Sequence, residues 1–323
     1  MAQENKKPKL TIISPTFNTG KFLRETIRSI LEQSYKNFEY IVIDGGSTDE
    51  TLAILNEYPQ IKWISEKDSD SLEAFRKGLV MARGDYIMHC CISDGYLDKD
   101  WFKKCVDALD NDREISLVWG NIQYITEEGQ LTEIACFPQF SKSIPPQKTE
   151  FAYAWLSTYG SLPEMNFCVR KSILEELFPL YEKNKLRRLE ACRDFGYIFN
   201  TMGYLPYFIP SIANFTRIHK NQLSQRGIES GIADLEFNNH LRKIKKYRQQ
   251  LILGRVTHRY RNGAGELLPY KFSLLKLLAW RIFFIPTSLM LSIQLFARPI
   301  LRKSPRAYKI GRRIFRIFYK LRG

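Results

Sequence analysis

The sequence predicts an α/β fold, with a mostly parallel sheet flanked by helices and a basic, amphipathic helical tail after it. Three observations support this fold class. Short apolar runs that end in turn residues alternate with stretches of helical periodicity across residues 10–109. The connections between them are short, as in strand–helix–strand units of a parallel sheet. Residues 267–323 contain thirteen Lys and Arg but no Asp or Glu, unlike the rest of the chain.

Four strands and the helices between them occupy the first third of the chain. Residues 10–14 (LTIIS) form an apolar strand that we expect to stop at Pro15. Residues 22–33 follow with apolar side chains at helical spacing, and residues 47–50 carry capping and acidic side chains that open the next helix. The other predicted elements are strands at 40–43, 61–65 and 86–91 and helices at 72–81 and 101–109.

The loops after these strands form the expected ligand site, because parallel sheets bind ligands beyond the carboxyl ends of their strands. Three of the four loops contain carboxylates, and the loops lie at residues 15–18, 44–47, 66–70 and 93–95. The middle of the chain is less regular. It has predicted helices at 172–178 and 195–202 and late strands at 207–209 and 212–215.

Composition and charge divide the chain into three parts. Hydrophobic residues make up 44% and charged residues 26%, which is ordinary for a globular protein. The net charge of +15 is concentrated in the tail, so the preceding residues are almost neutral. We therefore expect a main domain at 1–225 (halves at about 9–120 and 121–225), a helical connector at 226–266 and a tail at 267–323.

The tail has the pattern of a membrane-associating segment. Residues 282–297 carry no charge, but they are fewer than the about 20 apolar residues that span a bilayer. Residues 308–321 place apolar side chains on one helical face and cations on much of the rest, as in helices that lie in a membrane interface. A basic tail on a nearly neutral body favours anionic lipid headgroups over nucleic acid as the partner.

The cysteines and the amino terminus indicate the compartment. None of the six cysteines forms a C-x-x-C pair or lies near a histidine at metal-ligand spacing, so we interpret them as reduced thiols. Residues 1–9 are polar and lack the apolar core of a signal peptide. Together with the tail, these features predict a peripheral or monotopic protein at the cytoplasmic face of a membrane.

Two long stretches carry a resemblance to a known family. Residues 11–23 (TIISPTFNTGKFL) and 29–51 (SILEQSYKNFEYIVIDGGSTDET) resemble the start of a family 2 inverting glycosyltransferase with a GT-A fold, of the bacterial polysaccharide-biosynthesis type. The resemblance covers about residues 9–225 and weakens after Trp119. It implies transfer of a sugar, with inversion, from a nucleotide diphosphate donor (UDP-linked in the first instance) to a glycan or polyprenyl-linked acceptor.

The resemblance implies a nucleotide-binding set at the first three loops. By matching position, residues 15–18 and Asp44 hold the base and ribose, through Pro15, Thr16, Phe17, Asn18 and the Asp44 carboxylate. Asp68 stands at a third nucleotide-contacting position, and Arg76 replaces a usual Asn where a cation can meet a phosphate. The alternatives are a plain turn with a helix cap at 44–46 and a solvated surface charge at Arg76.

The resemblance also implies a divalent cation, Mg²⁺ or Mn²⁺, and this sequence departs from the pattern there. Asp94 matches the first acid of the family's acidic pair and contacts the nucleotide diphosphate, while Gly95 replaces the second acid. One carboxylate with waters and phosphates can hold Mg²⁺, and His219 is a second candidate ligand. Asp98 and Asp100 are alternatives that would otherwise cap or decorate the next helix.

The catalytic base and the acceptor residues are placed in the second half. Cys192 falls on the family's usual base, so Asp194 is the candidate base and Glu190 the fallback, unless Asp194 only caps the helix at 195–202. Glu164 and Arg217 are the acceptor-side candidates, and Arg217 can also reach the diphosphate. Since Gly95 and Cys192 both stand where acids are expected, the alternative is a catalytically impaired nucleotide-sugar-binding or scaffold protein of a membrane polysaccharide-assembly complex.

Overall fold

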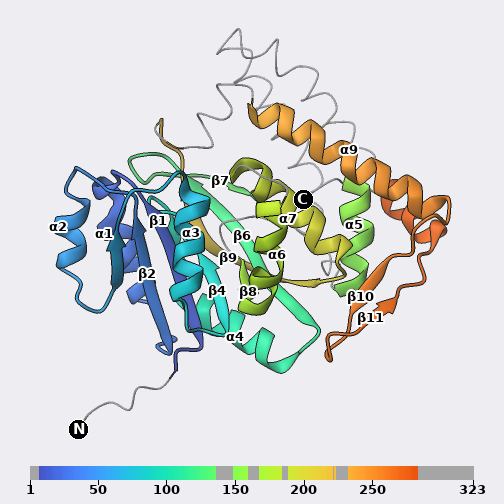
Figure 1. Ribbon diagram of the computed structural model, residues 1–323, viewed down its shortest axis with the longest axis horizontal. Coiled ribbons are helices and arrows are strands. Elements are labelled where there is room, and N and C mark those ends of the chain that lie inside the picture. The colour runs from blue at the N-terminus through green and yellow to red at the C-terminus, as the bar shows by residue number, and fades with distance from the viewer. Residues whose placement is uncertain are drawn as a thin grey trace.

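The computed structural model describes residues 7–135, 148–158, 167–183, 188–220, 222 and 232–282. Its main feature is a mixed, mostly parallel sheet with helices on both faces (Figure 1). Within the described residues the strand order is β3-β2-β1-β4-β8-β6-β9-β5, and β7 pairs with β6. The predicted fold class is therefore confirmed for this part of the chain, whereas residues 283–323, with the predicted interfacial helix, lie outside the described residues.

The first half follows the predicted order. Its elements are β1 (Leu10–Thr16), α1 (Gly20–Leu31), β2 (Phe38–Asp44), α2 (Thr51–Asn56), β3 (Lys62–Ser65), α3 (Ser71–Met81), β4 (Tyr86–His89), β5 (Gly95–Tyr96) and α4 (Trp101–Asn111). The expected stop of β1 at Pro15 is wrong, because the strand pairs with β2 as far as Thr16. Proline is tolerated because β4 pairs with β1 only up to Ile13, so no ladder bond on that side needs its N–H.

The second half is more regular than the sequence predicts. It contains β6 (Ile115–Ile125), β7 (Leu131–Ala135), α5 (Phe151–Thr158), β8 (Cys168–Arg170), α6 (Lys171–Lys183), α7 (Arg188–Thr201) and β9 (Leu205–Arg217). The two predicted late strands are one strand, β9. Its pairing with β6 shifts register near Trp119 and Asn121, so the strand continues through Pro210 and Ser211 at an irregularity. α7 begins seven residues earlier than expected, at Arg188.

Two apolar layers hold the helices to the sheet. Alternate residues of β1 and β2 enter different layers: Ile13 and Ile41 pack in one, and Ile12 and Val42 in the other. The first layer contains apolar residues of α3, α5, α6 and α7, and the second contains those of α1, α2 and α4. Strands buried on both faces explain why their sequences read as continuous apolar runs.

The connector after β9 packs on the domain. α9 (Ile232–Ile252) contributes Ile244 and Leu251 to the first layer. It is followed by a hairpin of β10 (Arg259–Arg261) and β11 (Leu267–Pro269), which the sequence did not predict, and by a helical stretch at residues 274–282. No helix among the described residues is both long and apolar enough to cross a membrane. Residues 283–297 of the predicted charge-free segment lie outside the described part.

The described cysteines form no disulfide. Cys90, Cys105 and Cys168 are buried free thiols, and Cys91 is a half-buried one. These four agree with the prediction of reduced thiols that act mainly as small apolar side chains.

Candidate active site

The loops after β1 and β2 are tied together by hydrogen bonds. The Gly45 N–H donates to the Thr16 carbonyl oxygen at 2.9 Å, and the Thr48 N–H donates to the Asn18 side-chain oxygen at 2.8 Å. Asn18 and Gly46 both adopt positive φ, at 51° and 86°, which Asn and Gly tolerate best. The chain can therefore turn sharply after each strand, and the predicted nucleotide-binding loop is rigidly supported.

The Asp44 carboxylate stabilises the loop after β2 through hydrogen bonds. It is fully buried and accepts hydrogen bonds from the backbone N–H groups of Gly46 at 3.1 Å and Ser47 at 2.9 Å. The Ser65 hydroxyl donates to the same oxygen at 2.6 Å, and the Ser47 hydroxyl donates to the other. Asp44 thus stabilises the turn at residues 44–46, as the plain-turn alternative expected. A contact between Asp44 and a nucleotide stays a prediction.

Other members of the predicted nucleotide set differ in their exposure. Phe17 is 59% exposed, Asn18 is exposed and Pro15 is half-buried, whereas Thr16 is buried. Phe17 and Asn18 therefore present an aromatic face and an amide at the edge of the sheet where a base and ribose are expected. An exposed aromatic ring is the kind of group on which a base can stack.

Asp68 lies beside the second loop. A Cβ atom at Gly45 would be only 3.0 Å from a carboxylate oxygen of Asp68, so the two segments touch. Burial raises the pKa of Asp68, and the neighbouring carboxylates of Glu73, Asp70 and Asp44 add to the rise, while Lys77 opposes it. The structure therefore brings Asp44 and Asp68 together. Arg76 lies exposed on α3, and its contact with a phosphate stays a prediction.

Asp94 is buried in the loop that follows β4, directly before β5. The two-residue strand β5 pairs with β9, which brings Asp94 next to Arg217, and the backbone N–H of Arg217 donates to Asp94 Oδ1 at 3.0 Å. Asp94 Oδ2 has no hydrogen-bond donor among the described residues. Burial raises the pKa of Asp94 to about 7, against the opposing effects of the Arg217 N–H, the Arg217 charge and the Thr216 hydroxyl.

The missing second acid has a steric explanation. A Cβ atom at Gly95 would lie 2.6 Å from the Ser29 hydroxyl oxygen and 2.7 Å from the Phe215 ring. These distances are too short for any side chain without a shift of α1 or β9. Asp98 and Asp100, the alternative acids, are engaged near the start of α4: Asp98 pairs with Lys104 at 2.6 Å and Asp100 accepts from the Ser34 hydroxyl at 2.6 Å.

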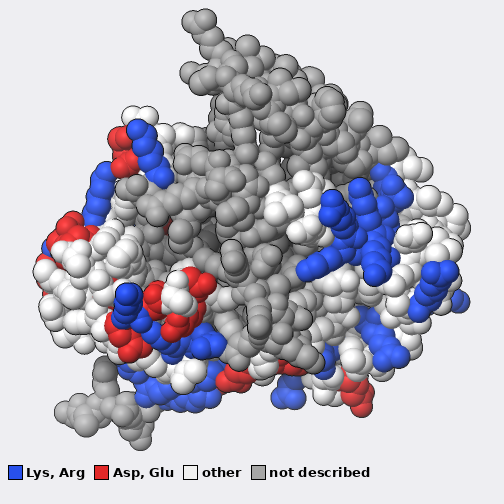
Figure 2. All heavy atoms as spheres, turned by 45° about the horizontal axis from the view of Figure 1, so that its top comes forward, with Lys and Arg blue, Asp and Glu red and all other residues white. Residues whose placement is uncertain are grey.

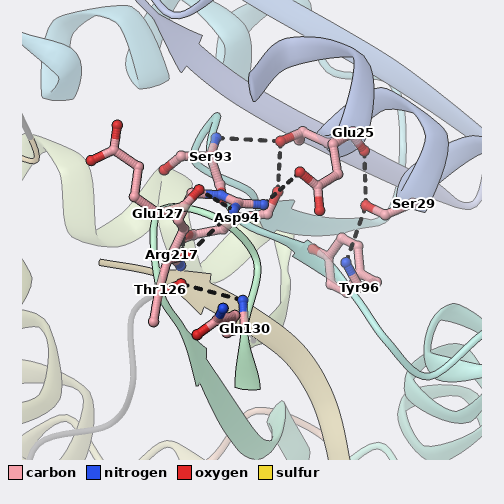
Figure 3. Close-up of polar contacts among 10 residues, drawn as sticks. Glu25, Ser29, Ser93, Asp94, Tyr96, Thr126, Glu127, Gln130 and Arg217 are labelled. Carbon is pink, nitrogen blue, oxygen red and sulfur yellow. Dashed lines mark hydrogen bonds and ion pairs between the residues drawn. The ribbon is translucent and has the colours of Figure 1, made fainter. Parts of the chain in front are cut away.

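Arg217 is buried, and all three of its guanidinium nitrogens donate to protein oxygens (Figure 3). Its side chain is 3% exposed and pairs with Glu25 at 2.5 Å. The guanidinium also lies 5.0 Å from the centre of the Phe22 ring, in cation–π geometry. The predicted contact of Arg217 with acceptor or diphosphate stays a prediction, although each guanidinium nitrogen already donates to a protein oxygen.

His219 is two residues beyond Arg217 and packs on Phe22, with ring centroids 5.1 Å apart. Burial lowers the pKa of His219, which favours the neutral imidazole that a metal ligand requires. The described residues contain no group of three or more His, Cys, Asp or Glu side chains placed to hold a metal. The buried Asp94 Oδ2 without a donor fits a divalent cation that takes its other ligands from a diphosphate and water.

The candidate base lies on α7. Because α7 begins at Arg188, Asp194 is inside the helix, and the alternative that Asp194 only caps a helix at 195–202 is wrong. Glu190 is on the same helix, one turn earlier. The side chains of Glu190 and Asp194, and the whole of Glu164, lie outside the described part, so their roles stay predictions.

Sequence reasoning missed the contribution of α1. Thr26 and Ser29 are polar residues on the apolar face of this helix, and both bond to the loop that carries Asp94. Their signal was present: they fall at helical spacing among Phe22, Leu23 and Ile30, where a buried polar side chain needs a partner. Only the structure identifies that partner as the loop after β4.

The fold and the site together define an α/β protein with carboxylates at the end of β2 and in the loop after β4, two parallel strands that lie on either side of β1. The family described as Glycosyl transferase family 2 matches residues 11–178, which is more than half of the chain. This chain belongs to that family.

Individual relatives agree with this assignment. The chain is 31% identical to a chondroitin synthase of Escherichia coli over 128 residues, which are 38% of this chain and 18% of that protein. It is 30% identical to a PGL/p-HBAD biosynthesis glycosyltransferase of Mycobacterium bovis over 120 residues, which are 36% of this chain and 47% of the other. The chain thus matches less than half the length of these relatives.

A solved structure shows the same fold. The mannosyltransferase PcManGT from Pyrobaculum calidifontis, in complex with GDP-Man and Mn²⁺, superimposes with a TM-score of 0.53. The superposition covers 93% of this chain and 88% of that protein, at 16% sequence identity. At this identity the likeness concerns the fold, which is of GT-A type.

Proposed function

We propose that this protein transfers a sugar, with inversion, from a nucleotide diphosphate donor to a glycan or polyprenyl-linked acceptor in bacterial cell-envelope polysaccharide biosynthesis. The observation that carries the proposal is the position of Asp44 at the carboxyl end of β2 and of Asp94 in the loop after β4, with β2 and β4 flanking β1 in the sheet and Asp68 touching the Asp44 loop. UDP is the nucleotide expected from the sequence resemblance. The related PcManGT was solved with GDP-Man, so both nucleotides belong in the test.

The described residues support different roles for the side chains at the carboxyl ends of the strands. Phe17 and Asn18 are exposed and can frame the base and ribose, while Asp44 keeps their loop in place from beneath. Asp94, with His219, would hold a divalent cation, which when bound neutralises the charge that develops on the leaving diphosphate. Preorganised charges of this kind lower the barrier because they need no rearrangement during the reaction.

The acceptor side is proposed to supply the base. A carboxylate on α7, Asp194 or else Glu190, removes the proton from the acceptor hydroxyl as the hydroxyl attacks the anomeric carbon. The sugar–phosphate bond breaks on the opposite face, which inverts the configuration, and the nucleotide leaves as its diphosphate. This one-step displacement needs only a base, an aligned acceptor and a stabilised leaving group.

Donor turnover by the purified protein tests the proposal. With Mn²⁺ or Mg²⁺ and a panel of UDP- and GDP-linked sugars, we expect release of the nucleoside diphosphate in the presence of a suitable acceptor. Asp194→Asn should lower kcat by roughly 100-fold or more if Asp194 is the base, and Glu190→Gln should have the smaller effect. Turnover that survives both substitutions would reject the base assignment.

A catalytically impaired relative is the second candidate, and Gly95 is the observation that favours it. Without room for a second acid, a cation at Asp94 has fewer protein ligands. Calorimetry distinguishes the two functions: nucleotide binding without turnover across a broad acceptor panel would favour a nucleotide-sugar-binding or scaffold role. Turnover with any donor would exclude that role.

We further propose that the protein docks on an anionic membrane surface on its cytoplasmic side. The helical stretch at 274–282 exposes four apolar side chains, between 50% and 79%, which are Leu274, Leu275, Leu278 and Ile282. α9 exposes the cations Arg242, Lys243, Lys245 and Lys246. Figure 2 shows Lys and Arg gathered on the right of the molecule, where Figure 1 places α9. Exposed apolar residues next to cations are typical of interfacial membrane binding.

Vesicle sedimentation tests the membrane proposal. Leu277 is buried in the core, so a deletion that preserves the domain should start after residue 282 rather than at 267. We expect this deletion, and Leu275→Asp with Leu278→Asp in the full chain, to reduce binding to anionic vesicles. Val80→Asp on α3 is the matched control, because Val80 is 81% exposed away from this surface. Binding that is equal for all variants would contradict the proposal.

A further inference from the structure

The loop that carries Asp94 is fixed by groups from other elements. Ser93 has a φ of 96°, a left-handed conformation that is uncommon for residues other than Gly. Strained backbone of this kind persists only where the surroundings impose it, and it often occurs at functional sites. The contacts that impose it here come from α1 on one side and from Arg217 of β9 on the other (Figure 3).

The contacts from α1 use the hydroxyls of the buried Thr26 and the half-buried Ser29. The Thr26 hydroxyl accepts from the Ser93 N–H at 3.3 Å and donates to the Asp94 carbonyl oxygen at 2.6 Å. The Ser29 hydroxyl accepts from the Tyr96 N–H at 3.1 Å. These bonds hold the backbone on both sides of Asp94, but none of them reaches its carboxylate.

Arg217 supplies the contact to the carboxylate and links it to the rest of the site. Its backbone N–H donates to Asp94 Oδ1 at 3.0 Å, and its side-chain Nε donates to the Ser93 carbonyl oxygen at 3.3 Å. The guanidinium therefore holds the Ser93 backbone, and only the main chain of Arg217 contacts the carboxylate. Nη1 donates to the carbonyl oxygens of Glu127 at 2.8 Å and Thr126 at 3.3 Å, in the turn after β6. Nη2 pairs with Glu25 at 2.5 Å, so the positive charge of the buried guanidinium is balanced by a carboxylate.

We propose that the Arg217 guanidinium and Glu25 form a positioning pair that fixes the backbone of the Asp94 loop, and with it the Asp94 carboxylate, for the donor diphosphate. This inference rests on the proposed function, and it gives Arg217 a role through Asp94 instead of direct contact with substrate. A planar guanidinium is suited to the task, because it donates in three directions within one rigid plane. Lysine offers a single flexible ammonium, so it cannot join Ser93, the turn after β6 and Glu25 at once.

The chain offers a matched control on the same helix. Arg24 lies next to Glu25 on α1 and pairs with Glu57, and both partners are about half exposed, at 52% and 47%. This pair has the same chemistry, but it has no bond to the Asp94 loop. Arg24→Lys and Glu57→Gln therefore remove the same kinds of interaction as Arg217→Lys and Glu25→Gln without touching the site.

The experiment measures equilibrium binding of UDP (or GDP, if the wild type prefers it) with Mn²⁺, and binding of the bare nucleoside, by calorimetry. Arg217→Lys and Glu25→Gln should weaken the diphosphate–Mn²⁺ affinity by roughly 10- to 100-fold, as is usual when the partner that orients a ligand is removed. Nucleoside affinity should stay the same, because the base and ribose are expected at the loops after β1 and β2. The control variants should change neither affinity by more than about twofold.

Three outcomes decide the matter. Selective loss of diphosphate affinity supports the positioning role, and a partial recovery in Glu25→Asp would strengthen it. Equal loss of diphosphate and nucleoside affinity, or no loss in variants that melt like the wild type, would overturn it. If Arg217→Lys does not fold, Glu25→Gln carries the test, because Glu25 is 54% exposed. A wild-type protein that binds neither UDP nor GDP would instead reject the proposed function itself, and the positioning role with it.

Discussion

Replacing Gly95 by alanine should destabilise the protein, because the site has no room for a Cβ atom. That atom would lie 2.6 Å from the Ser29 hydroxyl oxygen and 2.7 Å from two carbons of the Phe215 ring. Neither neighbour moves freely. The Ser29 hydroxyl donates to the Thr26 carbonyl at 2.8 Å and accepts from the Tyr96 N–H at 3.1 Å, and Phe215 is buried within β9.

The expected magnitude follows from these contacts. Overpacking of a well-ordered site by one methyl group reduces the free energy of unfolding by about 1–3 kcal/mol. If the Ser29 hydroxyl turns away, the loss of its bond to Tyr96 adds about 1 kcal/mol. Each kcal/mol lowers the melting temperature of a large domain by about 2–4 °C, so scanning fluorimetry and guanidinium denaturation can both measure the change.

Gly263→Ala is the control, because its Cβ would meet nothing closer than 3.3 Å, at Arg113, and we expect a change within about 0.5 kcal/mol. Gly95→Asp should be worse than Gly95→Ala, since it adds a buried carboxylate next to Asp94. A Gly95→Ala variant as stable as the wild type would show that the site accepts a Cβ atom, contrary to this prediction. The prediction is contradicted equally if Gly95→Asp gains metal affinity without any loss of stability.

Three further predictions concern other parts of the molecule. Glu39→Gln should reduce the free energy of unfolding by about 1–3 kcal/mol, because buried Glu39 accepts from Lys62 at 2.8 Å and from the Arg83 N–H at 2.6 Å; unchanged denaturation curves would contradict this. Arg170→Met should have an effect of similar size, since its guanidinium donates to the carbonyls at the end of α4 and the start of β6; hydrogen exchange should rise there and not in β1. In metal-free buffer, Asp94→Asn should gain stability relative to the wild type as the pH rises. Burial raises the folded-state pKa of Asp94 from 3.8 to about 7. In the wild type, the protonated Asp94 carboxyl therefore contributes fully to stability below pH 3.8, and this contribution is lost as the pH approaches 7. The relative gain in the free energy of unfolding of Asp94→Asn should reach about 4 kcal/mol at most. If the two proteins differ in stability by the same amount at every pH between these values, the carboxyl is not buried in solution.

The first half of the fold could be predicted because its central strands, such as β1 and β2, are buried on both faces. Continuous apolar runs such as residues 40–43 and 86–89 have few alternatives to a central parallel strand, and turn residues mark their ends. The same logic places Asp44, Asp68 and Asp94 after their strands, which the structure confirms as positions. β6 and β8 were missed, because their partners in the sheet are distant in the sequence and no short-range pattern identifies them.

The candidate site was predicted less completely than the fold. Arg217 and His219 were identified as site residues, but nothing local to them indicates that Arg217 is buried against Glu25, 192 positions earlier in the chain. Thr26 and Ser29 read as ordinary polar residues of a helix. The alternative that Asp194 only caps a helix is wrong because helix boundaries depend on tertiary packing, which here extends α7 back to Arg188.

The sequence by itself determined the family, the order of the strands and helices in the first half, and the carboxylates that stand at the strand ends. These features are local: they depend on periodicity, on turn residues and on a motif that reads continuously over residues 11–51. Tertiary structure alone decided how Asp94 is held and why Gly95 has no side chain. Both depend on α1, β5 and β9 meeting at one point. Segments so far apart in the chain come into contact only when the sheet and its helices have assembled.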